Sequence, residues 1–164
     1  MSRVGTDHPR VHYDNATQAW RLLMGRNFHY GCFASPDQPL DDATAALTER
    51  MVQHAELNAD TTVIDVGCGI GGPAIHLART VGCTVTGIST SEVGVTTGNA
   101  LATSEGVADQ VSLLVRDGMD NGLPDAAFDR AWVMESSHLM PDKPAMIAEC
   151  ARVLRPGGRL VLCD

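Results

Sequence analysis

Glycines follow a short apolar run near the middle of the chain, in a pattern suited to ligand binding. The stretch Val63–Ala74 reads VIDVGCGIGGPA and sets Gly67, Gly69 and Gly72 in a G-x-G-x-x-G arrangement. Glycine permits a tight turn, and it lets a ligand approach the backbone with no Cβ in the way. The pattern therefore predicts a strand, a binding loop for a nucleotide-like ligand, and a helix.

Asp65 lies inside that predicted strand, two residues before Gly67. A buried carboxylate is costly unless it accepts hydrogen bonds or faces a cation. Asp65 is therefore expected either to face a cation, such as a sulfonium with an adjoining ammonium, or to cap amides of the glycine loop. A dinucleotide site would place an acid about 20 residues further on. The nearest acid there is Glu92, already entering a helix, which disfavours an NAD-type oxidoreductase.

A histidine and another aspartate follow two later apolar runs. His138 comes after the run Phe128–Met134, and Asp164 comes after Arg159–Cys163. Parallel strands end at one edge of a sheet, where ligands bind, and histidine is the natural base for a hydroxyl group near neutral pH. We predict His138 as general base, with Asp164 orienting it or binding the acceptor hydroxyl. The alternatives are a histidine that only lines a cleft and a solvated terminal aspartate.

The elements that must position these residues alternate along the chain, which predicts an α/β fold with a mostly parallel Rossmann-like sheet and helices on both faces. Strands are predicted at 61–66, 84–88, 111–116, 128–134 and 159–163. Helices are predicted at 41–57, capped by Asp41 or Asp42, and at 73–80, 91–105 and 143–154, with a turn at 155–158.

Composition excludes several other classes. The 164 residues carry a formal net charge of −8, with one lysine and no basic stripe, which argues against duplex nucleic acid as a partner. The five cysteines form no C-x-x-C pair, so neither a disulfide framework nor a metal site is expected. No apolar run reaches the roughly 18 residues of a membrane span, and no signal-peptide centre is visible. A single-domain cytoplasmic protein is expected.

Residues 1–40 differ from the remainder, 41–164. Five of the seven aromatic residues lie in the first 33 positions, and Gly31, Pro36 and Pro39 interrupt any regular element. One short helix is expected near Asn15–Met24. We interpret this segment as an arm, or lid, over the core.

Three motifs resemble class I S-adenosylmethionine-dependent methyltransferases. Val63–Ala74 is similar to the family's first motif, Val115–Met119 to the end of its third strand, and Arg152–Gly158 to the turn before its fifth strand. The arm segment Asn27–Phe33 resembles one found in small-molecule enzymes such as the rebeccamycin sugar O-methyltransferase. Sterol and tocopherol C-methyltransferases share the G-G-P-A ending of the glycine loop.

The resemblance implies S-adenosyl-L-methionine as cofactor, a small-molecule acceptor and O-methylation, with an E-S-x-H segment and a following aspartate as candidate bases. C-methylation of an isoprenoid or alkene, with Glu135 holding a cationic intermediate, and a protein that binds the cofactor without transferring methyl are the alternatives. No N-P-P-Y segment follows the fourth strand, which disfavours amino-group methylation. The residues implied at the cofactor are Tyr13, His29, Asp65, Gly67, Cys68, Gly69, Ser89, Asp117, Gly118, Met119 and Met134.

The chain departs from the resembled pattern at three places. Gly94 stands where a ribose-binding glutamine is common, and Cys32 where a tyrosine is common. The resembled fold has seven strands, and this chain ends after the fifth. The last strand is therefore expected to form an apolar sheet edge. A longer protein, or strands supplied by another polypeptide, is expected to complete the sheet. A homodimer is the alternative to a missing C-terminal part.

Overall fold

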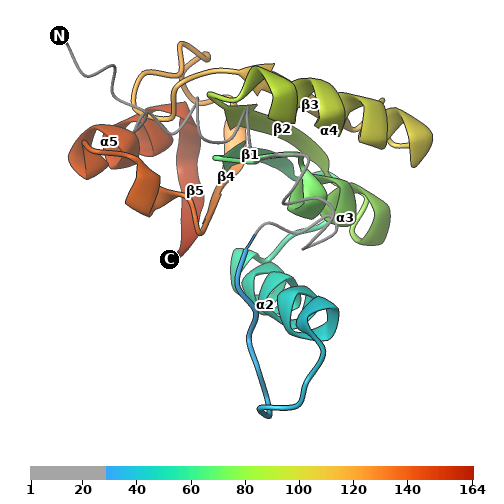
Figure 1. Cartoon of the computed structure of the whole chain (residues 1–164). Coiled ribbons are helices and arrows are strands. Elements are labelled where there is room, and N and C mark those ends of the chain that lie inside the picture. Colours follow the sequence, from blue (N-terminus) through green and yellow to red (C-terminus); the bar gives the residue numbers. More distant parts are fainter. Residues whose placement is uncertain (1–28) are drawn as a thin grey trace, which may run out of the picture.

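A computed structural model describes residues 29–164. This part of the chain contains five strands, four α-helices and a short 3₁₀ helix, and helices separate the strands except between the third and the fourth (Figure 1). The helices are α2 (Leu40–Ala55), α3 (Gly72–Thr80), α4 (Glu92–Ser104), η1 (Ser137–Leu139) and α5 (Lys143–Val153). The strands are β1 (Thr62–Val66), β2 (Thr84–Ser89), β3 (Val111–Val115), β4 (Phe128–Met134) and β5 (Leu154–Cys163).

The five strands form one parallel sheet in the order β3-β2-β1-β4-β5. The chain builds outward from β1 to β3 and then returns to the other side of β1 with β4. The loops after β1 and β4 consequently diverge at the carboxyl edge, which is where open α/β sheets bind ligands. This arrangement confirms the predicted α/β fold and its parallel sheet.

Two hydrophobic layers cover the two faces of the sheet. One contains Val63, Val85 and Trp132 from the strands together with apolar residues of α2, α3 and α4. The other contains Ile64 and Val133, packed against α5. Neighbouring residues along a strand point to opposite faces, so the short apolar runs that suggested strands are buried on both sides. Figure 1 shows α5 on the side of the sheet away from α3.

Two local expectations were wrong. Helix α2 begins at Leu40 after Pro39, so Asp41 and Asp42 lie in its first turn and cap nothing with their side chains. Acidic residues still suit that position because they face the positive end of the helix dipole. The predicted turn at 155–158 is instead an irregular part of β5: Leu154 already pairs with Phe128, and regular pairing resumes at Arg159.

Strand β5 lies at one edge of the sheet, as expected, with β3 at the other. Leu162 on β5 and Val115 on β3 are among the large apolar side chains left exposed. Within residues 29–164, no helix has the length and apolar character needed to cross a bilayer.

Candidate functional site

The loop after β1 turns sharply back across the end of β2. The amides of Gly67 and Cys68 both donate to the carbonyl of Ile88, at 2.9 and 3.0 Å. Gly67 and Gly69 have φ of 86° and 55°, a region that side-chain-bearing residues rarely adopt. A Cβ added at Gly67 would collide with Ser136, whereas one added at Gly69 would meet nothing within 4 Å. Gly69 therefore presents bare backbone to open space.

Asp65 is buried in β1, with 3% of its surface exposed. Its Oδ2 atom has no hydrogen-bond partner among the described residues. Burial raises the pKa of this carboxyl to about 7. The structure gives Asp65 no hydrogen bond to the glycine loop, and the amides of Gly67, Cys68 and Gly71 donate to the Ile88 and Cys68 carbonyls instead. An unpaired buried carboxyl group is costly, and a bound cation would offset that cost.

Cys68 follows Gly67 and is buried. Burial, and then the neighbouring Asp65 carboxylate, raise the pKa of the Cys68 thiol. The side chain is therefore an uncharged thiol that packs beneath the loop, and its sulfur lies 3.8 Å from the Gly69 carbonyl oxygen.

The ends of β2 and β3 lie together at the far part of the carboxyl edge. The Ser89 carbonyl accepts the amide of Arg116 at 3.0 Å, so the loop carrying Asp117 begins beside Ser89. Asp117 is exposed, and its Oδ1 accepts the amide of Met119 at 2.9 Å. Gly118 is buried, and an added Cβ there would lie 2.8 Å from Val66. The structure thus brings Ser89, Asp117, Gly118 and Met119 to one end of the edge.

Gly94 lies in the first turn of α4, directly against the glycine loop. Its amide donates to Ser91 Oγ at 3.0 Å, and an added Cβ would lie 3.0 Å from the Gly69 carbonyl oxygen. A glutamine at this position would have to displace the loop. The departure from the resembled pattern at Gly94 therefore accompanies a close approach between the backbones of α4 and the glycine loop.

Strand β4 is followed by a strained residue in a loop that is held from two sides. Glu135 follows Met134 with φ of 46°, although it is not glycine. Its amide donates to the Cys163 carbonyl at 2.7 Å, which fastens it to the end of β5. The hydroxyl of Ser136 donates to the Val66 carbonyl at 2.7 Å, which fastens the same loop to β1. Strain of this kind persists only where the surroundings impose it, as they often do at functional sites.

His138 and Asp164 meet at the carboxyl edge, as predicted. His138 Nδ1 lies 2.7 Å from Asp164 Oδ1, and the Ser137 hydroxyl donates to the other carboxylate oxygen. Burial raises the pKa of Asp164, but the hydrogen bonds from His138 and Ser137 outweigh it, so the net shift is downward. An ionised carboxylate only accepts, which places the proton of His138 on Nδ1 and leaves Nε2 free to accept one. Just over half of the His138 side chain, 54%, is exposed.

The described part of the arm is anchored over this loop. The amide of Tyr30 donates to Glu135 Oε2 at 2.6 Å, and the amide of Cys32 donates to the Ala43 carbonyl of α2 at 2.8 Å. His29 is buried, and its Nδ1 lies 2.8 Å from the Tyr30 carbonyl oxygen. Burial is the main reason that the pKa of His29 is lowered. Tyr13 and the helix expected near 15–24 lie outside the described residues.

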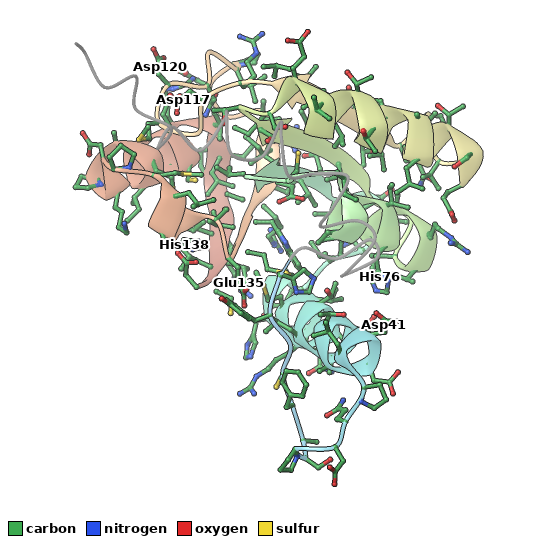
Figure 2. The ribbon with its side chains drawn as sticks, viewed as in Figure 1. Asp41, His76, Asp117, Asp120, Glu135 and His138 are labelled. Atoms are coloured by element: carbon green, nitrogen blue, oxygen red, sulfur yellow. The ribbon has the colours of Figure 1, made fainter. Side chains whose placement is uncertain are left out.

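The candidate site is therefore elongated. Figure 2 shows Asp117 and Asp120 well separated from Glu135 and His138 along the carboxyl edge. Asp65 and the glycine loop belong to β1, which lies between β2 and β4 in the sheet. The sequence did not predict Ser137 as a partner of Asp164, the hydrogen bond from the Tyr30 amide to Glu135, or the burial of Trp132. No group of three or more possible metal ligands occurs in the part of the chain that the structure describes.

Comparison with models of known families matches residues 64–162 to the family described as "Methyltransferase domain". A curated relative, the 27-O-demethylrifamycin SV methyltransferase of Amycolatopsis mediterranei, is 42% identical over 93% of this chain and 56% of its own length. The chain thus spans a little over half of that relative. The match to the family runs from within β1 to within β5 and includes the glycine loop and His138.

Solved structures share the fold. The structure described as the [4+2]-cyclase SpnF superposes with a TM-score of 0.85 at 32% identity, covering 92% of this chain and 57% of that one. A geranyl diphosphate methyltransferase in complex with SAM superposes with a TM-score of 0.74 at 27% identity, covering 83% of this chain and 61% of that one.

Proposed function

Because the chain belongs to the methyltransferase domain family, we propose that it forms the cofactor-binding part of an S-adenosylmethionine-dependent methyltransferase that methylates a hydroxyl group of a small molecule. The observation that carries the proposal is the buried Asp65 carboxyl group, which has no partner among residues 29–164 and lies on the strand that leads into the open backbone at Gly69. The curated relative that methylates a demethylrifamycin and the solved neighbour with bound SAM support this reading.

The residues along the carboxyl edge fit this cofactor. Asp65 offers a negative charge to the cationic methionine end, and Gly69 offers backbone without a Cβ. In the proposal, Asp117 and Met119 after β3 would hold the adenine, and Ser89, whose carbonyl accepts the amide of Arg116, would lie beside the ribose. The separation of Asp117 from Glu135 and His138 suits a long ligand that spans several strand ends (Figure 2).

The bound cofactor supplies an activated methyl group, and the protein aligns the acceptor with it. In the proposal His138 Nε2 takes the proton of the acceptor hydroxyl. Asp164 holds the ring through Nδ1 and stabilises the charge that His138 gains. Ser137 donates to the same carboxylate and fixes its rotation. The arm, anchored to Glu135, would limit access of water to this end of the site.

Calorimetry with S-adenosylhomocysteine, the demethylated product, tests the cofactor assignment. The wild type should bind it, and Asp65→Ala should weaken binding at least about 10-fold because a charge-assisted contact is lost. His76→Ala, in a surface ion pair with Glu49, is the matched control and should bind normally. Absence of binding by the wild type, or full affinity in Asp65→Ala, would refute the assignment.

A second candidate function is cofactor binding without methyl transfer. It is favoured by the likeness to the structure described as a [4+2]-cyclase. Incubation with cofactor carrying an isotopically labelled methyl group, and with candidate hydroxylated or isoprenoid acceptors, separates the readings. A labelled methyl group on a hydroxyl oxygen supports O-methylation, and one on a carbon atom supports the C-methylation alternative. Cofactor binding without a labelled product from any acceptor supports the second candidate.

A further inference from the structure

We propose that Trp132 Nε1 and Asp65 Oδ2 form one polar subsite for the α-amino-acid end of the cofactor, with the indole N–H donating to the α-carboxylate and Asp65 accepting from the α-ammonium. The inference rests on the proposed function and adds Trp132 as a binding residue. The two residues are direct partners in the parallel pairing of β1 with β4. Partners in this pairing project their side chains to the same face, side by side.

Both atoms lack a hydrogen-bond partner within the described residues, although both are buried. Trp132 has no exposed surface and Asp65 has 3%. Each buried polar group without a partner costs about 1–3 kcal/mol. No described residue satisfies these two groups, and their adjacent positions on one face indicate that a ligand with matching groups does so.

The chemistry of the pair selects the ligand. The indole N–H can only donate, and the ionised carboxylate can only accept. A ligand that satisfies both must carry an acceptor and a donor a short distance apart, as the carboxylate and ammonium of an α-amino acid do. The adenosine end of the cofactor is expected at Asp117, at a different place along the edge. The amino-acid end is therefore the part of the cofactor that remains for β1 and β4.

A third buried atom, in the arm, also lacks a partner, and the other neighbour of Asp65 in the sheet offers it none. His29 Nε2 is buried and has no partner in the part of the chain from residue 29 onward. His29 Nδ1 faces the Tyr30 carbonyl and carries the proton, so Nε2 is an acceptor. The neighbour of Asp65 on its other side is Gly87, where an added Cβ would lie 2.9 Å from Cys68 Sγ. The β2 side of Asp65 is thus filled by packing, and its polar neighbour on this face is Trp132.

The test compares two ligands by calorimetry: S-adenosylhomocysteine, which carries the amino acid, and 5′-methylthioadenosine, which lacks it. Trp132→Phe keeps an aromatic ring and removes the N–H. It should weaken binding of S-adenosylhomocysteine about 10-fold or more, as expected for a hydrogen bond to a charged group. Binding of 5′-methylthioadenosine should change less than about 2-fold.

A second measurement needs no change at Trp132. The chain has two tryptophans, Trp20 and Trp132, so in Trp20→Phe the emission reports Trp132 alone. S-adenosylhomocysteine should shift this emission, and 5′-methylthioadenosine should shift it much less. The fluorescence result stands even where Trp132→Phe fails to fold.

Each other outcome overturns the inference. Equal weakening of both ligands by Trp132→Phe would assign Trp132 a packing role only, and unchanged affinity for both would exclude the contact. Equal emission shifts with the two ligands would exclude it as well. A wild type that binds both ligands leaves the proposed function intact in these cases, whereas a wild type that binds neither refutes the proposed function together with the subsite.

Discussion

His138 and Asp164 are joined by a 2.7 Å contact between Nδ1 and Oδ1, although they follow different strands, β4 and β5. The parallel pairing of these strands ends at Met134 and Cys163, so the loops that follow them begin next to each other. The Ser137 hydroxyl donates to the second oxygen of the same carboxylate. The carboxylate is thus held by two donors, and the ring of His138 is turned so that Nε2 is free.

Removing the base should lower turnover and leave cofactor binding unchanged. His138→Ala should reduce kcat about 10²–10⁴-fold, the usual contribution of a positioned base. Asp164→Asn should also reduce kcat, because an amide that donates to Nδ1 favours the wrong tautomer and no longer stabilises a charged ring. Steady-state kinetics with a saturating acceptor, together with calorimetry for S-adenosylhomocysteine, measures both quantities.

The controls for this prediction are built into the chain. His76 is a surface histidine paired with Glu49 at 2.6 Å, and Figure 2 shows it well away from His138. His76→Ala should therefore keep full turnover. Unchanged kcat for His138→Ala between pH 6 and pH 9 would contradict the assignment of the base, and a parallel loss of cofactor affinity would point to a structural role.

Asp65 should link stability to pH in the absence of cofactor. Its pKa is raised to about 7 by burial, above the ordinary value of 3.8 that it regains on unfolding. Between these two values the folded state keeps a proton that the unfolded state loses, so stability falls as pH rises from about 4 to about 7. Asp65→Asn does not titrate and should be more stable than the wild type at pH 8, by up to about 4 kcal/mol for a three-unit shift.

Denaturant unfolding at pH 5 and pH 8 measures this effect. The gap between Asp65→Asn and the wild type should be larger at pH 8 than at pH 5. The stabilised variant should nevertheless lose affinity for S-adenosylhomocysteine, because an amide carries no charge for the ammonium. An equal gap at the two pH values would show that Asp65 is already satisfied in the folded protein.

Much of the fold could be predicted because short apolar runs alternate with helical patterns, and β1, β2 and β4 begin and end within one residue of the expected limits. The position of His138 and Asp164 at the carboxyl edge could be predicted because each comes within four residues of the end of a strand. The pairing of Asp65 with Trp132 could not, because it depends on the register between two strands far apart in the sequence. The hydrogen bond between Tyr30 and Glu135 could not be predicted either, because it depends on the path of the arm, and hydrophobic periodicity gives no information about that path.

Two glycines should respond in opposite ways to alanine. Gly69→Ala places a methyl group in open space at φ of 55°, so the fold should lose only about 1–2 kcal/mol from the left-handed backbone. Its cofactor affinity should fall sharply because the methyl group enters the ligand's space. Gly98→Ala, inside α4, should keep affinity per folded molecule but lose about 1–3 kcal/mol of stability, since its Cβ would lie 2.6 Å from the Ile70 carbonyl oxygen and collide with Leu113.

Thermal unfolding and calorimetry on these two variants separate folding from binding. A strongly destabilised Gly69→Ala that binds normally would mean that the loop faces protein and not ligand. A stabilised Gly98→Ala would mean that α4 can move away from the glycine loop. The higher helix propensity of alanine would then decide the sign of the change.

Asp129 should matter for stability alone, because it lies at the amino edge of the sheet, opposite the site. Its Oδ1 accepts from Arg155 at 2.7 Å, and its Oδ2 accepts the amide of Thr62 at 2.8 Å, which ties β1 and β4 to the irregular part of β5. The hydrogen bond from Arg155, followed by that from the Thr62 amide, lowers the pKa of Asp129 to about 2. Since this pKa lies below the ordinary value of 3.8, the stabilisation is complete above pH 4 and is lost as pH falls toward 2.

Asp129→Asn should therefore reduce the free energy of unfolding at pH 7 by about 1–2 kcal/mol, a value reduced for partial exposure of the pair. The difference from the wild type should shrink between pH 4 and pH 2, because the wild-type carboxylate is then protonated as well. Affinity for S-adenosylhomocysteine should stay within about 2-fold at pH 7. A difference that persists at pH 2, measured by urea unfolding, would mean that Asp129 acts through packing and not through its charge.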